Sequence, residues 1–218
     1  MKPIIYLSFF FISLFNIANA QVKLKDTIKA PNNNVFILEI EKVPEFPGGV
    51  NAFRKYIAKN LKYPEVAQLI GIDGKVVMLF TINEEGKVES TKPLNCIGAA
   101  CESEAENVLL NSPIWKPGIQ KGKPVKCTYS VPINFTIEKF KVKFRDLNAS
   151  NYGFIFNIKD SLYTIDEAEK IIGKSFQSDK IKIAVPFFNY NKIEKFDMPD
   201  KKEVYLIIFK KEEAQKID

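Results

Sequence analysis

The sequence predicts an α+β fold in which a small antiparallel sheet packs on helices. Residues 75–82 and 125–135 alternate apolar and polar side chains, as strands with one buried face do. Residues 50–61 instead carry apolar side chains three or four positions apart, which is typical of an amphipathic helix. The polar turn at 83–86 leads into a second strand, so a hairpin is expected there.

The N-terminal residues are expected to lie outside this fold. Residues 1–20 combine Lys2 with a mostly apolar run and end in a small-x-small triplet at 18–20, which predicts a signal peptide cleaved after Ala20. A membrane-spanning helix needs about 20 apolar residues, and this run is shorter. An uncleaved inner-membrane anchor with the rest of the chain in the periplasm is the alternative. Residues 21–34 are polar and predict a leader segment.

The composition excludes several classes of site. The chain has 32 Lys and Arg residues, 26 Asp and Glu residues and no histidine. Without histidine, Ser-His and Cys-His nucleophile pairs cannot form, and the commonest metal ligand is missing. The lysines are interleaved with acidic residues, which favours an ordinary solvated surface over nucleic-acid binding. We therefore expect no enzyme activity, no cofactor, no metal site and no nucleic-acid partner.

Residues 35–137 are expected to form the first folded unit, and prolines and glycines mark its elements. Pro64 suits the first position of a helix, where its missing N–H costs nothing, and Gly71 suits the helix end. Pro93 indicates an edge strand that ends early, and Pro113 stops a helix. The expected elements are a strand over 35–43, helices over 50–60 and 64–71, strands over 75–82 and 87–93, a helix from about 101 to 112 and a strand over 125–135.

Residues 145–212 predict a second small α+β unit, and no family is recognised there. Residues 152–158 are aromatic and β-prone. Thr164 and Glu167 have the spacing of a capping box before a helix that ends at Gly173. Two further strands are expected over 180–188 and 203–210, which gives the order β-α-β-β.

Short motifs appear in a fixed order between Val43 and Thr136. They are Val-Pro-Glu-Phe-Pro-Gly-Gly at 43–49, Lys-Tyr-Pro-Glu at 62–65, Gly-Ile-Asp-Gly-Lys-Val at 71–76, Ile-Trp-Lys-Pro-Gly at 114–118, Gly-Lys-Pro-Val at 122–125 and Val-Pro-Ile-Asn-Phe at 131–135. Together they resemble the C-terminal domain of TonB, in the form common in Bacteroidetes-type Gram-negative bacteria. The resemblance implies a noncatalytic domain that binds a short extended peptide, the TonB box, of an outer-membrane transporter.

A conventional TonB also carries a membrane helix and a long proline-rich spacer before this domain. The sequence shows no proline-rich spacer, so we expect a periplasmic binding protein. Two alternatives stay open. One is a membrane-anchored transducer that supplies energy for outer-membrane transport, and the other is a structural envelope protein that uses the TonB-like unit only for packing.

The strand over 125–135 is the strongest candidate for partner binding. Pro132 cannot donate to a sheet ladder, so part of this strand is expected at a sheet edge, open to an incoming strand. Burial of this edge under the second unit is the alternative, and open edges would also permit a homodimer. The resemblance places the segment before Tyr63 near the bound peptide, with a packed ring as the alternative for Tyr63. The predicted partner-binding residues are Lys62, Tyr63, Pro64, Lys126, Thr128, Ser130, Pro132 and Ile133.

The remaining candidates are structural. Trp115 is the only tryptophan and is held between two prolines, so a buried anchor is favoured over a binding residue. An exported protein can form a disulfide. Cys96 and Cys101 are the candidate pair, and pairing of Cys127 with either of them stays open. The expected structural positions are Gly71, Gly74, Trp115, Pro117 and Gly118.

Overall fold

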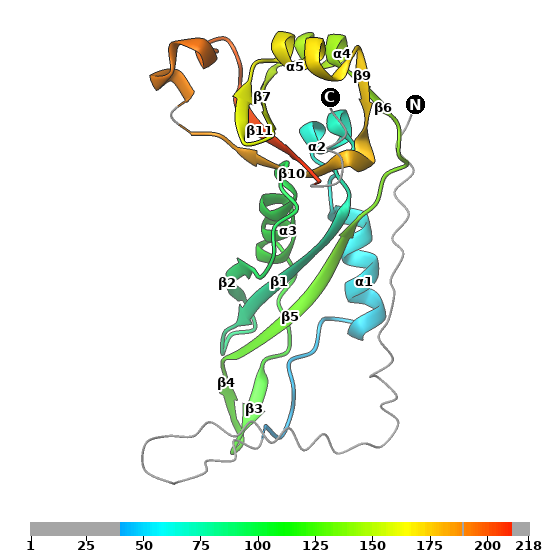
Figure 1. Ribbon diagram of the computed structural model, residues 1–218. Helices are drawn as coiled ribbons and strands as arrows, with labels where there is room; N and C mark the ends of the chain where they lie inside the picture. The colour runs from blue at the N-terminus through cyan, green and yellow to red at the C-terminus, as the bar shows by residue number, and fades with distance from the viewer. Residues whose placement is uncertain (1–39, 189, 211–218) are drawn as a thin grey trace, which may run out of the picture.

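The computed structural model describes residues 40–188 and 190–210 of the chain. It shows an elongated α+β molecule in which the C-terminal part sits at one end of the N-terminal part (Figure 1). We call residues 40–137 the first unit and the described residues from 138 onward the second unit. The predicted signal peptide and leader segment lie outside the described residues.

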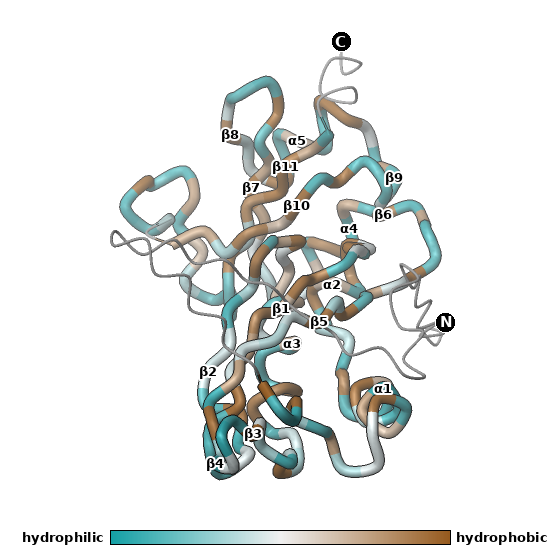
Figure 2. The backbone as a smooth tube through the Cα atoms, turned by 90° about the horizontal axis from the view of Figure 1, so that it is seen from below, coloured by the Kyte–Doolittle hydropathy of each residue, from teal (hydrophilic) through white to brown (hydrophobic). Residues whose placement is uncertain are grey.

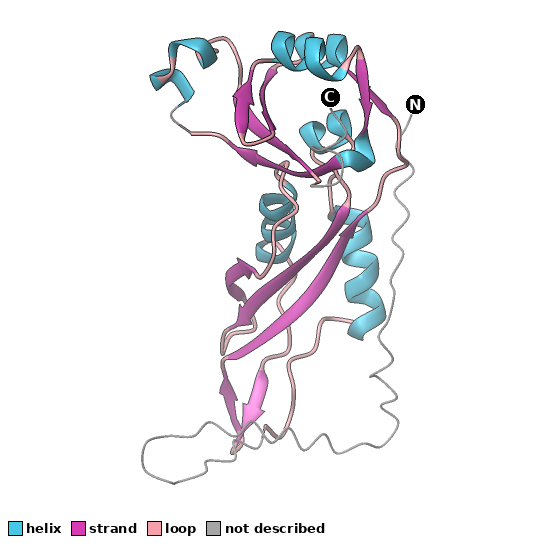
Figure 3. Cartoon of the chain, viewed as in Figure 1, coloured by secondary structure: helices cyan, strands magenta, loops and turns pink. Residues whose placement is uncertain are grey.

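Most helices and strands of the first unit follow the predicted order, but the short strands over 118–120 and 123–125 were not predicted. The elements of the first unit are α1 (Gly49–Asn60), α2 (Glu65–Ile70), β1 (Gly74–Ile82), β2 (Val88–Pro93), α3 (Cys101–Leu110), β3 (Gly118–Gln120), β4 (Lys123–Val125) and β5 (Cys127–Phe135). The antiparallel sheet has the strand order β2-β1-β5, and β3 and β4 form a separate hairpin at the far tip (Figure 3).

The strand predicted over 35–43 is not formed in the described part of this stretch, which begins at Ile40. Isolated bridges hold the stretch instead, and one of them pairs Lys42 with Ile119. The backbone N–H of Glu41 also donates to the Ile119 carbonyl at 2.9 Å. Because the partner strand β3 has only three residues, it cannot support a continuous ladder.

The strand predicted over 125–135 is divided in two. Val125 ends β4, where it pairs with Gly118, whereas Cys127 begins β5, where it pairs with β1. Lys126 separates the two pieces, because they belong to different sheets.

Alternation along β1 places every second side chain in the core, as predicted. Val76, Met78, Phe80 and Ile82 are all at most 3% exposed. Helix α1 packs into this core through Ile57, but Val50, which was expected on the same helix face, is 62% exposed. Phe46 fills the neighbouring core position instead, with its ring 5.2 Å from the ring of Phe53.

The second unit is more complex than the predicted β-α-β-β order. Its elements are β6 (Lys141–Lys143), α4 (Phe144–Asn148), β7 (Tyr152–Ile158), β8 (Ser161–Tyr163), α5 (Ile165–Ile172), β9 (Ser175–Gln177), β10 (Ile181–Pro186) and β11 (Glu203–Phe209), with short 3-10 turns over 178–180, 190–192 and 194–196. The main sheet has the order β10-β11-β7-β8, and β6 pairs with β9.

The predicted elements of the second unit are all present. The capping box of α5 is confirmed, because Thr164 accepts a hydrogen bond from the Glu167 backbone and the Glu167 side chain accepts one from the Thr164 backbone. The missed elements, β6, α4, β8 and β9, are three to five residues long. Segments this short contain too few positions to show a hydrophobic period.

The two units share one contiguous hydrophobic core. Their backbones also meet, since the N–H of Ala99 donates to the carbonyl of Ala184 at 2.6 Å. The hydroxyl of Tyr152 donates to the carboxylate of Glu65 at 3.1 Å. The second unit therefore packs against one end of the first unit and does not extend along the β2-β1-β5 sheet (Figure 1).

Candidate functional site

Strand β5 forms an edge of the β2-β1-β5 sheet. It pairs with β1 along its whole length, from Gly74 opposite Phe135 to Ile82 opposite Cys127. Within residues 40–188 and 190–210, no strand pairs with the other side of β5. The predicted edge strand is therefore present, and the second unit does not supply a neighbouring strand for it.

The hydrogen bonds of Val77 on β1 show which backbone groups of β5 point outward. The N–H of Val77 donates to the side-chain oxygen of Asn95 at 2.7 Å, and its carbonyl accepts from the N–H of Leu94 at 2.8 Å. Both partners lie just after β2, so the backbone of Val77 faces β2 and not β5. Val77 stands opposite Pro132, and backbone directions alternate along antiparallel strands. The carbonyl of Pro132 therefore points to the open edge.

The same alternation assigns the other outward groups of β5. The N–H and C=O groups of Thr128 and Ser130 point to the open edge together with the carbonyl of Pro132. Pro132 lacks an N–H, and its outward direction means that no bond to β1 is lost. The groups of Tyr129 and Val131 point to β1 instead.

The two faces of β5 differ in exposure. Thr128, Ser130 and Pro132 have exposed side chains on the open face of the sheet. The hydroxyl of Thr128 lies 3.0 Å from that of Thr81 on β1. Ile133 is 1% exposed, so its predicted contact with a partner is wrong for the side chain. It belongs to the buried face, because it follows Pro132 by one position in a strand.

Lys126 is exposed, but its ammonium group is already paired. It lies 2.5 Å from the carboxylate of Glu89 on β2, the opposite edge of the sheet. This hydrogen bond raises the pKa of Lys126. The side chain therefore points away from the open edge of β5, which does not fit the predicted contact with a partner.

The segment 62–64 contributes less to a binding surface than was predicted. Tyr63 is 8% exposed, its hydroxyl donates to the carbonyl of Ile72 at 2.5 Å, and its ring lies 5.6 Å from that of Phe135. Burial raises the pKa of Tyr63 well above its usual value. The packed-ring alternative is therefore correct. Pro64 is half-buried at the start of α2, and only Lys62 is exposed.

Residues 59–137 match the family model described as Gram-negative bacterial TonB protein C-terminal. The predicted resemblance to TonB is confirmed. The matched segment contains all of β1, β2, α3 and β5 and ends before the second unit.

Two solution structures of the Helicobacter pylori TonB C-terminal domain are similar to the chain at 24% identity. One match covers 39% of this chain and 90% of that chain with a TM-score of 0.29. The other covers 42% and 87% with a TM-score of 0.27. Scores this low support no inference about function. A comparison with curated proteins gave no match.

The structural residues of the TonB-like segment are placed largely as predicted. Trp115 is 9% exposed, and its ring contacts those of Phe46, Phe53 and Phe80 at 5.2, 5.0 and 5.7 Å. Gly118 begins β3 directly after Pro117, and Gly74 begins β1.

Gly71 ends α2 in a left-handed conformation with φ +70. A Cβ atom at this position would lie 2.4 Å from the Cβ of Ser178 in the second unit. Glycine is therefore required both by the backbone conformation and by the close approach of the two units.

The cysteines of the TonB-like segment are free thiols, so the structure does not contain the predicted Cys96–Cys101 disulfide. Cys101 and Cys127 are buried, whereas Cys96 is exposed. Burial of Cys101 and partial burial of the Cys96 thiol are the main causes that raise the pKa of these two groups, and the nearby Glu102 carboxylate adds to both shifts. Both groups are therefore protonated at neutral pH and are poor nucleophiles.

Sequence reasoning named Lys62 as a binding residue but missed the two lysines on the helix before it. Lys55 and Lys59 are exposed on α1, and the exposed Lys62 follows three residues after Lys59 in the loop beyond the helix. The signal was present in the sequence, because residues 49–64 contain no acidic residue. A search for a binding strand alone does not reveal it, since these residues lie on a helix.

Proposed function

We propose that this chain is a noncatalytic envelope protein that binds an extended peptide of an outer-membrane transporter by β-strand addition at β5. The open edge of β5 carries the proposal. The match of residues 59–137 to the TonB C-terminal family supports the class of partner.

Strand addition would use the outward backbone groups of β5. Thr128 and Ser130 each offer an N–H and a C=O, and Pro132 offers a C=O, so the docked peptide gains main-chain hydrogen bonds at every second residue. Such bonds do not depend on the side chains of either strand. Affinity should therefore respond to backbone changes on β5 more than to changes of its exposed side chains.

The proposal includes export to the periplasm after cleavage behind Ala20. Residues 1–20 lie outside the described residues. No helix within the described part of the chain is long and apolar enough to cross a membrane. Intact mass of the native protein tests this step, and a chain that retains Met1 and fractionates with membranes would instead favour the membrane-anchored transducer.

The binding mechanism is tested by Ser130→Pro, with Ser130→Ala as the matched control. Proline removes the outward N–H of Ser130 but no hydrogen bond to β1, so the sheet should persist. Loss of one hydrogen bond should weaken binding of a TonB-box peptide roughly fivefold or more, measured by fluorescence anisotropy. Alanine keeps the N–H and should bind like the parent chain.

Circular dichroism shows whether both variants are folded. Equal affinities of folded Ser130→Pro and Ser130→Ala would exclude this edge as the binding site. A peptide methylated at alternate amides is a second probe, because methylation removes donors from the partner without touching the protein. One of the two methylation registers should abolish binding.

A further inference from the structure

Helix α1 and the loop after it carry an unbalanced run of positive charge. Residues 49–64 contain Arg54, Lys55, Lys59 and Lys62 and no acidic residue. The three lysines are exposed, and none of them forms an ion pair within residues 40–188 and 190–210. Residues 107–137 also contain four lysines and no acidic residue. The run over 49–64 differs from it because one helix, α1, holds Lys55 and Lys59 together on its surface.

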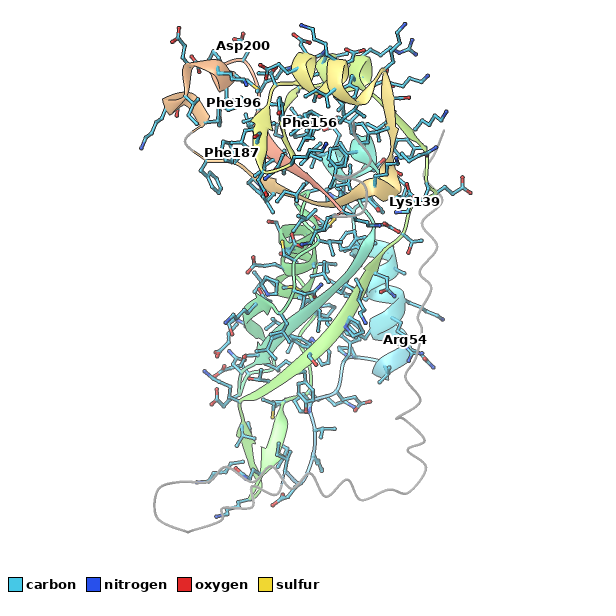
Figure 4. All side chains as sticks on the ribbon, viewed as in Figure 1. Arg54, Lys139, Phe156, Phe187, Phe196 and Asp200 are labelled. Atoms are coloured by element: carbon cyan, nitrogen blue, oxygen red, sulfur yellow. The ribbon has the colours of Figure 1, made fainter. Side chains whose placement is uncertain are left out.

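Two of the lysines lie on one side of α1, and the third lies in the loop after its last residue, Asn60. Lys55 and Lys59 are four residues apart and therefore neighbours on the helix surface, and Lys62 follows three residues later. The opposite side of the helix faces the core through Ile57. Figure 4 shows Arg54 projecting from the same helix at the outer side of the molecule. We call Lys55, Lys59 and Lys62 the lysine stripe.

The lysine stripe lies on the side of the sheet where β5 is open. In Figures 1 and 2, α3 lies on the β2 side of the sheet and α1 on the β5 side. The ring contacts show that α1 covers the buried face of the sheet, since Phe53 packs on Phe80 of β1. Tyr63, three residues after the end of α1, packs on Phe135 of β5. A strand added to β5 extends the sheet by about 4.8 Å toward α1.

Two acidic residues near the stripe accept hydrogen bonds, one from the backbone of Lys62 and one from a tyrosine of the second unit. The carboxylate of Glu104 accepts the backbone N–H of Lys62 at 2.7 Å. The carboxylate of Glu65 accepts from the hydroxyl of Tyr152. Neither carboxylate forms an ion pair with an ammonium group of the stripe, so these ammonium groups are available to a partner.

We infer that the lysine stripe binds an acidic segment that flanks the docked strand of the partner. This inference rests on the proposed strand addition at β5 and adds the chemistry of the flank. The ammonium groups are point charges on flexible stems, which suit a mobile carboxylate-rich flank better than a rigid bidentate contact. The attraction acts at the surface and is weakened by salt.

Three peptides test the inference. Each contains the same TonB-box sequence, and its flanks are four glutamines at both ends, four glutamates at the N-terminal end, or four glutamates at the C-terminal end. One acidic peptide should bind about threefold to tenfold more tightly than the glutamine peptide at low salt. The gain should shrink when the ionic strength rises from about 0.05 to 0.3 M.

Two double variants locate the effect. Lys55→Gln/Lys59→Gln removes two charges of the stripe, and glutamine has nearly the same helix propensity as lysine. Lys121→Gln/Lys123→Gln removes two exposed charges at the distant β3–β4 tip. The gain from glutamate should be lost in the first variant and kept in the second.

The outcomes separate the two proposals. If the glutamine peptide binds but neither acidic flank adds affinity, strand addition stands and the acidic flank is excluded. An equal loss of the gain in both double variants would also exclude it, because general positive charge would then explain the effect. If no peptide binds the folded chain, both proposals are wrong.

Discussion

At the scale of single residues, burial separates the structural from the binding candidates. Trp115 was predictable from sequence, because a lone tryptophan between prolines has few alternatives to packing. The burial of Ile133 was also predictable from the alternation along its strand, which conflicts with its choice as a binding residue. The burial of Tyr63 was not, since the family pattern marks a segment as close to the partner without saying which atoms face it. Only the structure shows the Tyr63 ring against Phe135, whereas the burial of Ile133 agrees with the alternation.

The ring cluster around Trp115 gives the first prediction. Trp115→Ala should lower the free energy of unfolding by about 3–5 kcal/mol, because it removes a large buried ring from contact with Phe46, Phe53 and Phe80. Trp115→Phe is the control, and its free energy of unfolding should fall by less. Urea melts followed by circular dichroism provide the measurement. An alanine variant within about 0.5 kcal/mol of the parent would contradict burial of this ring.

Tyr129 gives a prediction about pH. Burial raises its pKa to about 12, above the value of about 10 for an exposed tyrosine. The folded state therefore favours the neutral phenol, so its contribution to stability is complete below about pH 10 and is lost as pH rises toward 12. The urea midpoint of the parent chain should fall between about pH 10 and pH 12. The midpoint of Tyr129→Phe should fall less steeply over the same pH range. Identical pH profiles for both chains would show that this phenol is not desolvated.

At the scale of elements, long periodic segments were predictable and short ones were not. Strands β1, β5, β7 and β11 have seven to nine residues each and lie where strands were predicted, β1 and β5 from alternation and β7 from its aromatic, β-prone composition. The break at Lys126 was not predictable, because alternation continues across it while the strand partner changes. The outward direction of the β5 backbone also depends on pairing, which a single sequence does not specify.

The capping box of α5 can be tested separately. Thr164→Ala should destabilise the chain by about 1 kcal/mol, because it leaves the backbone N–H of Glu167 without its side-chain acceptor. Thr164→Ser keeps the hydroxyl and serves as the control. Thermal melts of both variants decide the outcome. Equal melting temperatures would show that this cap contributes nothing to stability.

At the scale of the whole molecule, the sequence predicted two units, and the structure joins them through one core. Apolar periodicity shows that a face is buried but does not identify the segment that covers it. A core shared by two units therefore cannot be predicted from periodicity. Two contacts between the units illustrate this point, the close approach of Gly71 to Ser178 and the hydrogen bond from Ala99 to Ala184. Neither contact could be predicted from a pattern within one unit.

The shared core predicts that the TonB-like unit depends on the second unit. A chain that ends at Ile137 should lose cooperative unfolding or aggregate, because its buried apolar surface would face water. Size-exclusion chromatography and thermal melts compare it with the chain that continues to Asp218. A shortened chain that melts cooperatively at the same temperature would show that the first unit is independent.

Amide hydrogen exchange tests the strand-addition account most directly. In the free protein, the amides of Thr128 and Ser130 point to the open edge and should exchange fast, whereas those of Tyr129 and Val131 face β1 and should be protected. Addition of a TonB-box peptide should protect Thr128 and Ser130 selectively. If the peptide binds and the exchange of these two amides stays unchanged, the peptide does not pair with β5, and the proposed mechanism is wrong.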